Sequence, residues 1–141
     1  MSILNKDFFE GNEVIFVGYS GKNQGFCGNV HKAFINNGIK VYAVNNKEGG
    51  TYDIKVYKHL EELPKIPKTA YVLQNKENSQ KAVKELAEKG VRKILFQSSR
   101  NVDASTLEEC KKMGIETIVA CPMMKFGSGI HKLHGFFAGV R

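Results

Sequence analysis

The sequence predicts a single α/β domain of the doubly wound, Rossmann-like type, in which helices cover both faces of a mostly parallel sheet. Its 141 residues fit one domain of ordinary size. Short apolar runs alternate with stretches of helical periodicity, as expected of repeated β-α-β units. Three helical stretches end in the same pattern, a glycine followed by an apolar residue that leads into a strand: Gly38-Ile39, Gly90-Val91 and Gly114-Ile115.

The first half of the chain contains three predicted strands and one predicted helix. Residues 14–17 form a continuous β-branched and aromatic run, which is typical of a strand buried on both faces. Apolar residues then recur at helical spacing from Gly25 until Asn37-Gly38. A second strand follows at 41–44, and the alternating residues 54–57 predict a short, half-exposed edge strand.

The second half repeats the alternation of strands and helices. On the helix that ends at Gly90, Lys81 and Glu85 are spaced to pair on the exposed face. Asp103 is the predicted N-cap of the next helix. Strands are predicted at 71–73, 94–96 and 115–119, an N-terminal extension at 1–11, and a closing segment at 125–141 with a helix at 128–138.

Composition limits the classes of protein to which the chain can belong. No apolar run approaches the roughly 20 residues that a membrane helix needs, so we expect no membrane association. The first residues lack the apolar core of a signal peptide, and three widely spaced cysteines do not form a disulfide framework. We therefore expect a cytoplasmic protein.

The net charge of +7 favours a small anionic ligand over a nucleic acid. A positive field attracts phosphates of any kind, including those of a nucleotide. However, 18 of the 21 basic residues are lysines, whereas the reading of base edges favours arginine. No run of five basic residues occurs, so a nucleic-acid partner is not expected.

The predicted fold locates the ligand site before any motif is considered. In doubly wound sheets, ligands bind beyond the carboxyl ends of the strands, where the strand order reverses. The candidate site therefore comprises the strand ends at 17–20, 44–47, 73–76 and 96–99.

The loop from Gly18 to Gly28 is the strongest local feature, because four glycines in eleven residues let backbone N–H groups approach a ligand. The helix that follows offers its N-terminus to a phosphate. The dinucleotide pattern G-x-G-x-x-G fails because Ser20 occupies the second glycine position, and the Walker pattern fails because Asn23 follows Lys22. A plain flexible loop is the alternative interpretation.

The end of the second strand disfavours NAD. An NAD site needs a carboxylate there to hold the ribose hydroxyls, and this chain has Asn45-Asn46-Lys47. Lys47 would instead tolerate a ribose phosphate, as in NADP or in the 3′-phosphate of coenzyme A.

Candidate catalytic and metal-binding residues are few, and we predict neither a catalytic nor a metal site. Ser20 lacks the G-x-S-x-G elbow of a nucleophile, and Cys121 fits a small buried hydrophobe better than a reactive thiol. His131 and His134 share a helix face and with Cys121 would supply three zinc ligands, but surface or interface histidines fit this spacing better. The aromatic stripe at 126–137 predicts packing in the core or in a homodimer.

Taken in order, several fragments resemble the small, stand-alone CoA-binding domain proteins related to the N-terminal domain of the succinyl-CoA synthetase α-subunit. The resemblance covers about residues 12–124. It is carried by Val17-Gly18-Tyr19-Ser20, residues 37–45, Tyr57, Leu60-Glu61-Glu62-Leu63-Pro64, Phe96-Gln97 and the cysteine that closes the last strand, Cys121.

The resemblance implies binding of coenzyme A, or of a related adenine nucleotide, without catalysis by this chain. Gly18, Tyr19 and Ser20 would cradle the phosphates. Asn45 would meet the adenosine end, and residues 73–76 and Gln97 would line the cleft. The full predicted set is Gly18, Tyr19, Ser20, Lys22, Gly25, Asn29, Asn45, Lys47, Leu73, Gln74, Lys76 and Gln97.

The chain departs from the family pattern at positively charged positions. The family commonly has arginine where this chain has Asn29, and Arg-Arg where it has Gln74-Asn75. Loss of these groups weakens phosphate binding, and Lys22, Lys47 and Lys76 would compensate in part. Two alternatives remain open: an enzyme that acts on an acyl-CoA or a nucleotide, and a dimeric interaction or regulatory module.

Overall fold

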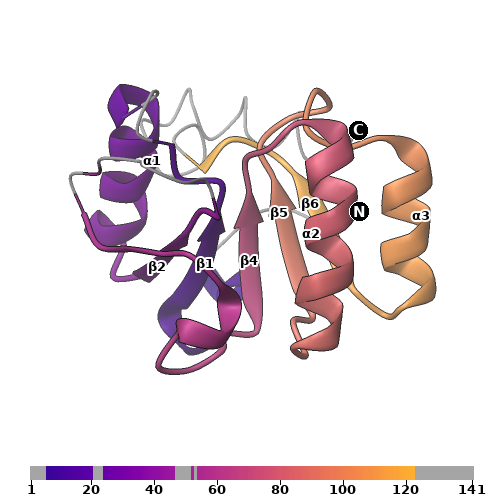
Figure 1. Ribbon diagram of the computed structural model, residues 1–141, viewed down its shortest axis with the longest axis horizontal. Helices are drawn as coiled ribbons and strands as arrows, with labels where there is room; N and C mark the ends of the chain where they lie inside the picture. The colour runs from indigo at the N-terminus through magenta and orange to yellow at the C-terminus, as the bar shows by residue number, and fades with distance from the viewer. Residues whose placement is uncertain (1–5, 21–23, 47–51, 53, 123–141) are drawn as a thin grey trace.

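The computed structural model describes residues 6–20, 24–46, 52 and 54–122. Its strands form one parallel sheet in the order β3-β2-β1-β4-β5-β6 (Figure 1). This order confirms the predicted doubly wound, Rossmann-like fold. The strands are β1 (Glu13–Val17), β2 (Lys40–Val44), β3 (Val56–Tyr57), β4 (Thr69–Val72), β5 (Lys93–Phe96) and β6 (Glu116–Val119).

The strand order reverses at β1, which lies between β2 and β4. From β1 the chain moves outward through β2 to β3, then returns to β4 and continues in the other direction to β6. Val17, at the carboxyl end of β1, is in register with Val44 of β2 and Val72 of β4. The loops after these three strands therefore begin at one level, on either side of the reversal point.

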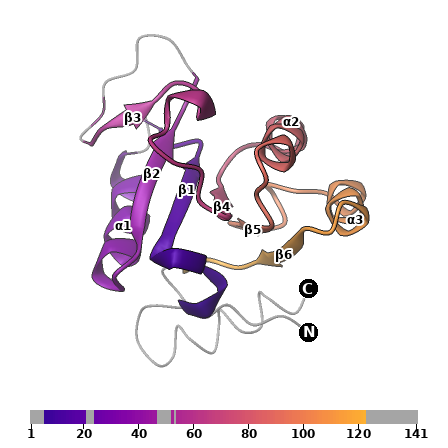
Figure 2. The same cartoon turned by 90° about the horizontal axis from the view of Figure 1, so that it is seen from below.

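Helices cover both faces of the sheet, as Figure 2 shows with the sheet seen from one end. Helix α1 (Gln24–Asn36) lies on one face, and α2 (Lys76–Glu88) and α3 (Ala104–Lys112) lie on the other. Two buried clusters correspond to these faces: Phe16 and Tyr71 pack with α1, whereas Val17 and Val72 pack with α2. The alternation of side chains along each strand supplies both cores.

The predicted helix boundaries are confirmed where side chains and glycines define them. The Asp103 carboxylate caps α3 by accepting a hydrogen bond from the Thr106 N–H at 3.0 Å. That bond lowers the pKa of Asp103 below its usual value. Gly38, Gly90 and Gly114 end their helices with φ of +76°, +90° and +77°, a conformation that favours glycine.

The structure also corrects several details. The edge strand is shorter than predicted, because only Val56 and Tyr57 pair with β2. Lys81 lies 3.7 Å from Glu77 instead of pairing with Glu85. Short 3-10 turns span Lys6–Phe8 and Glu10–Asn12, and Phe8 and Phe9 are buried on the α1 face.

The predicted closing helix at 128–138 lies outside the described residues. Among the residues that are described, no helix has the length and apolar character needed to cross a membrane.

Candidate functional site

A pocket of about 300 Å³ opens at the carboxyl end of the sheet, between the reversal point and α2. Its position is the one that the sequence predicts for a doubly wound fold. The strands contribute Val17, Val44, Asn45 and Asn46. The loop after β3 contributes Lys58, His59 and Leu60, the exit of β4 contributes Gln74, and α2 contributes Asn78, Lys81, Ala82, Glu85 and Leu86.

The pocket combines an apolar lining with hydrogen-bonding and charged groups. Val17, Val44 and Leu86 are almost fully buried and supply the apolar part. Four primary amides, two lysines, one histidine and one carboxylate supply the polar part. Apolar lining with a few convergent polar groups is typical of sites for small organic ligands.

Gly18 fixes the turn that leaves β1. Its φ is +97°, and a Cβ at this position would lie 2.3 Å from the Leu73 carbonyl oxygen and 2.8 Å from Cγ of Gln74. The Gly18 N–H donates to the Val44 carbonyl at 2.9 Å. Only glycine fits this position, because the turn is packed against the exits of two neighbouring strands.

The side chain of Tyr19 points into the core. Its ring is fully buried and packs edge-on against Phe16, with 5.1 Å between ring centroids. The Ser20 N–H donates to Sγ of Cys27 at 3.4 Å. The sequence predicts that Gly18 and Ser20 bind phosphates, but the N–H groups of both residues donate to acceptors within the protein. The Tyr19 ring is not part of the pocket lining.

Asn45 belongs to the pocket and also holds the turn after β1. Its Nδ2 donates to the Tyr19 carbonyl at 2.7 Å, and its backbone N–H donates to the Tyr57 carbonyl at 2.9 Å. One side chain therefore links the pocket lining to the glycine-rich loop, and the residue also connects β2 with the exit of β3.

Gln74 is the second predicted site residue that lines the pocket. Its carbonyl accepts hydrogen bonds from Asn101 Nδ2 at 2.7 Å and from Ser79 Oγ at 3.3 Å. The Asn75 side chain caps α2 by accepting from the Asn78 N–H at 2.7 Å. These bonds fix the loop between β4 and α2, so the wall formed by α2 has a defined position.

Gln97 belongs to a different environment, because it is not part of the pocket lining. Its Oε1 accepts a hydrogen bond from the hydroxyl of Tyr71, a buried residue on the α1 face. Burial raises the pKa of that hydroxyl well above its usual value, and the nearby thiols of Cys121 and Cys27 raise it further. This group of side chains lies at the same edge of the sheet as the pocket, but on the other face.

The remaining predicted residues are dispersed. Leu73 is half-buried and packs with the α1-face cluster, and Lys76 is exposed at the start of α2. Gly25 and Asn29 are exposed on α1. Lys22, Lys47, His131 and His134 lie outside the described residues, as does the aromatic stripe at 126–137.

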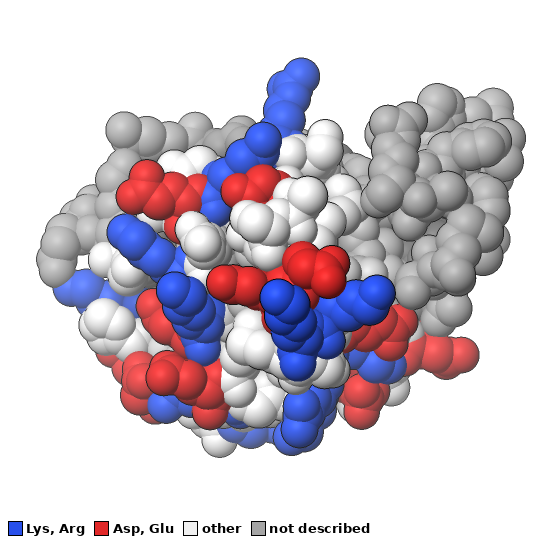
Figure 3. All heavy atoms as spheres, turned by 90° about the vertical axis from the view of Figure 1, so that its right-hand side faces the viewer, with Lys and Arg blue, Asp and Glu red and all other residues white. Residues whose placement is uncertain are grey.

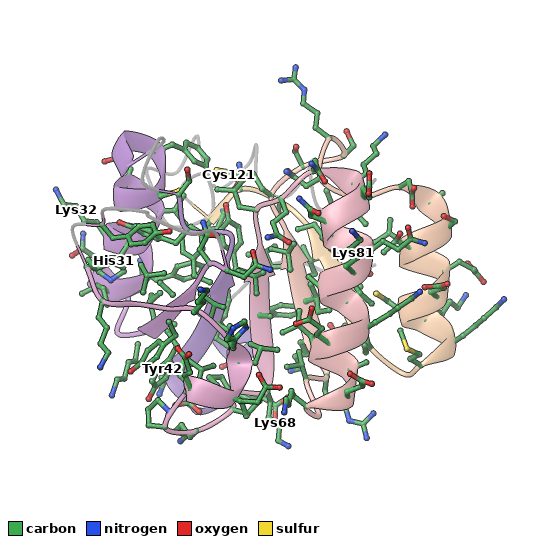
Figure 4. The ribbon with its side chains drawn as sticks, in the orientation of Figure 1. His31, Lys32, Tyr42, Lys68, Lys81 and Cys121 are labelled. Atoms are coloured by element: carbon green, nitrogen blue, oxygen red, sulfur yellow. The ribbon has the colours of Figure 1, made fainter. Side chains whose placement is uncertain are left out.

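The cysteines that the structure describes are all buried. Cys121 is 7% exposed and lies near the upper edge of the molecule in Figure 4. Burial raises the pKa of Cys110, in α3, to about 11. Within the described residues, no group of three or more His, Cys, Asp or Glu side chains is arranged to hold a metal ion.

The sequence did not identify the wall of the pocket that α2 and the loop after β3 form. Asn78, Lys81 and Glu85 face the pocket at helical spacing, and Lys58 and His59 follow the edge strand. The rule that ligands bind at strand ends selects only loops. The repeated spacing of polar side chains next to Ala82 and Leu86 was the available signal.

Surface charge outside the pocket is mixed on the face that carries α2 and α3. Figure 3 shows basic and acidic side chains interspersed over this face. Among the described residues seen in this view, no broad surface of one charge is present. This face therefore lacks the basic stripe that is typical of a nucleic-acid interface.

Comparison with solved structures supports the fold. The PH1109 protein redesigned for binding is 19% identical, with a TM-score of 0.72 over 92% of this chain and 93% of that one. A conserved hypothetical protein from Pyrococcus furiosus is 21% identical, with a TM-score of 0.65 over 86% and 97%. A hypothetical protein from Pyrococcus horikoshii is 19% identical, with a TM-score of 0.70 over 87% and 89%.

Comparison with protein families gives the assignment. No curated protein matches the chain. The family model described as a CoA binding domain matches residues 12–127, which include every described strand and helix from β1 to β6. The chain therefore belongs to the CoA binding domain family.

Proposed function

We propose that this protein binds coenzyme A, or a related adenine nucleotide, in the pocket at the reversal point of the sheet, and that it does so without catalysis of its own. One observation carries the proposal: in a chain that belongs to the CoA binding domain family, the pocket opens where doubly wound sheets bind nucleotides.

The size and lining of the pocket fit the nucleoside end of such a ligand. At about 300 Å³, the pocket is at the lower limit for small-molecule sites, which span about 300–1,000 Å³. It therefore accommodates a base and its sugar, and the rest of a longer ligand would lie outside it. Val17, Val44 and Leu86 offer apolar contacts to a base, and Asn45 and Gln74 offer amides to its polar edge.

The helix that follows the glycine-rich loop would receive the phosphates. Helix α1 begins at Gln24, and its N-terminal turn carries partial positive charge. A Cβ on Gly25 would meet no atom within 4 Å, so the space beside this turn is open. Lys22 and Lys47 remain predicted phosphate contacts.

The proposal includes no reaction, because the side chains that the enzymatic alternative requires are not part of the pocket lining. Ser20 is half-buried beside Cys27, and Cys121 is buried after β6. A binding role requires neither of them.

Thermal denaturation with and without ligand tests the proposal. A ligand that binds only the folded state at 100 times its Kd stabilises that state by about 2.7 kcal/mol. We expect coenzyme A to raise the Tm and NAD to leave it unchanged. Absence of any shift at millimolar coenzyme A, with the fold intact by circular dichroism, contradicts the proposal.

A matched pair of variants locates the binding. Asn78 is exposed and lines the pocket, whereas Gln80 is exposed on the same helix but is not part of the lining. Asn78→Trp is expected to block the pocket and abolish the shift, and Gln80→Trp to preserve it. Equal shifts in the two variants would place the ligand elsewhere.

A further inference from the structure

Two lysines from different elements line the pocket. This inference rests on the proposed function and concerns which nucleotides the pocket selects. Lys58 comes from the loop after β3, and Lys81 comes from the wall that α2 forms. Neither lysine belongs to the glycine-rich loop.

Lys58 lies next to the end of β2. Tyr57 pairs with Val44 in the sheet, and the Tyr57 carbonyl accepts a hydrogen bond from the Asn45 N–H at 2.9 Å. The next residue, Lys58, is fixed through its own N–H, which donates to Oε1 of Glu62 at 3.0 Å. The backbone of Lys58 is therefore held in a defined position beside the end of β2.

Doubly wound folds recognise the ribose of a nucleotide at the end of the second strand. A carboxylate there accepts the ribose hydroxyls, whereas a cation near the same place accommodates a ribose phosphate. In this protein the neutral Asn45 and Asn46 follow β2, and Lys58 contributes a positive charge to the pocket that they line. This arrangement favours a ligand with a phosphate on the ribose.

Lys81 adds a second cation from α2. Its ion pair with Glu77 is 3.7 Å long, and the two side chains are 69% and 79% exposed. Such an exposed pair contributes little to stability, so Lys81 can exchange it for a ligand phosphate. Figure 4 shows Lys81 on α2, and the helix side that bears it also contributes Glu85 to the pocket. Glu85 is the single carboxylate in the lining, against two lysines.

We propose that Lys58 and Lys81 bind a phosphate monoester on the ribose of the nucleotide, so that the pocket selects phosphorylated over unmodified ribose. Coenzyme A carries this group at the 3′ position and NADP carries it at the 2′ position. Both lysines supply charge-assisted hydrogen bonds, which are about twice as strong as neutral ones.

Isothermal titration with two matched ligand pairs tests this selectivity. Coenzyme A is compared with 3′-dephospho-coenzyme A, and NADP is compared with NAD. In the wild-type protein, we expect the phosphorylated member of at least one pair to bind about tenfold more tightly or better. The first pair reports recognition at the 3′ position, and the second reports recognition at the 2′ position.

Variants assign the selectivity to the two lysines. Lys58→Gln and Lys81→Gln are each expected to reduce the preference about fivefold or more, through weaker binding of the phosphorylated ligand alone. Lys84→Gln is the control, because Lys84 is exposed on α2 and is not part of the pocket lining. It should leave both affinities within about twofold of the wild type.

Each outcome has a distinct meaning. Equal affinity within both ligand pairs overturns the selectivity, while measurable binding of either coenzyme A form leaves the proposed function standing. A preference that survives in the Lys58→Gln/Lys81→Gln double variant overturns the assignment to these lysines. If no ligand of either pair binds the wild-type protein, the proposed function itself fails.

Discussion

The two edges of the sheet are held together by different interactions. At the amino edge, ion pairs join neighbouring segments: Lys65 Nζ lies 3.1 Å from Glu13 Oε2, and Lys89 Nζ lies 3.0 Å from Glu61 Oε2. At the carboxyl edge, amides donate to carbonyls: Asn45 to Tyr19, and Asn101 to Gln74. Ion pairs thus join segments at the amino edge, whereas amide hydrogen bonds hold the loops after β1 and β4 at the carboxyl edge.

The amino edge also places basic side chains where helices end. Lys68 Nζ would lie 3.8 Å from a Cβ on Gly90, and an Arg92 nitrogen would lie 3.9 Å from one on Gly114. Figure 4 shows Lys68 at this edge, opposite Cys121. Cations suit the carbonyl ends of helices, so lysines and arginines at this edge stabilise the fold.

The position of a lysine decides its role more than the total charge does. The net charge of +7 predicts attraction for anions in general. Lys65 and Lys89 form ion pairs at the amino edge, and Lys58 and Lys81, of which Lys81 also lies 3.7 Å from Glu77, line the pocket at the carboxyl edge. We therefore expect changes at the carboxyl edge to affect ligand binding, and changes at the amino edge to affect stability alone.

The largest effect is expected from Gly18→Ala at the carboxyl edge. The φ of +97° and a Cβ only 2.3 Å from the Leu73 carbonyl oxygen force the backbone to move. We expect a loss of about 3 kcal/mol or more in the free energy of unfolding, measured by urea denaturation.

Gly25→Ala is the control for that variant. A Cβ on Gly25 meets nothing within 4 Å, and alanine favours helix more than glycine does. We expect no loss of stability, or a gain of up to about 1 kcal/mol. Similar losses in the two variants would show that the close approach at Gly18 does not govern the turn.

A smaller effect is expected from Asn45→Ala, which removes the hydrogen bond to the Tyr19 carbonyl. The free energy of unfolding should fall by about 1 kcal/mol, and coenzyme A should bind more weakly because the pocket lining and the turn both change. Urea denaturation and titration calorimetry measure these two quantities.

Glu10→Gln provides the comparison at the amino edge. Glu10 lies 3.4 Å from Lys93 Nζ and is half exposed. Its loss should cost at most about 0.5 kcal/mol and leave coenzyme A binding unchanged. Weaker ligand binding in Glu10→Gln would contradict the division between the edges.

The smallest effect is expected from Asp103→Asn, and it depends on pH. Hydrogen bonds from Thr106 and Ser105 lower the pKa of Asp103 below its usual value. A lowered pKa adds stability above the unfolded-state value, and that stability is lost as the pH falls through the folded-state value. Asparagine still caps the helix but has no charge. The wild type should therefore have the higher Tm at pH 7, and the difference should shrink below about pH 4. A difference that stays constant down to pH 2 would contradict this assignment.

Local signals in the sequence were sufficient to predict the fold. Gly38, Gly90 and Gly114 marked the helix ends because few other residues adopt a positive φ, and Asp103 marked a helix start. These features act within a few residues along the chain. The parallel sheet with helices on both faces then followed from the general rules for β-α-β units.

The site was only partly predictable, because long-range packing decides it. Asn45 and Gln74 follow directly from the strand ends, and both line the pocket. Tyr19 lies between a glycine and a serine, and no local pattern indicates that its ring enters the core beside Phe16. Lys81 reaches the pocket only because α2 packs against the sheet, a contact between distant segments.

The most direct test of coenzyme A binding in the pocket is a titration with this ligand, monitored through the backbone amide NMR shifts of the assigned protein. We expect saturable shifts at the carboxyl edge, at Asn45, Lys58, Gln74 and Asn78, and no change in the amides of Glu10 and Lys93 at the amino edge. Saturable shifts centred on the amino edge, or no shifts at millimolar coenzyme A, would contradict it.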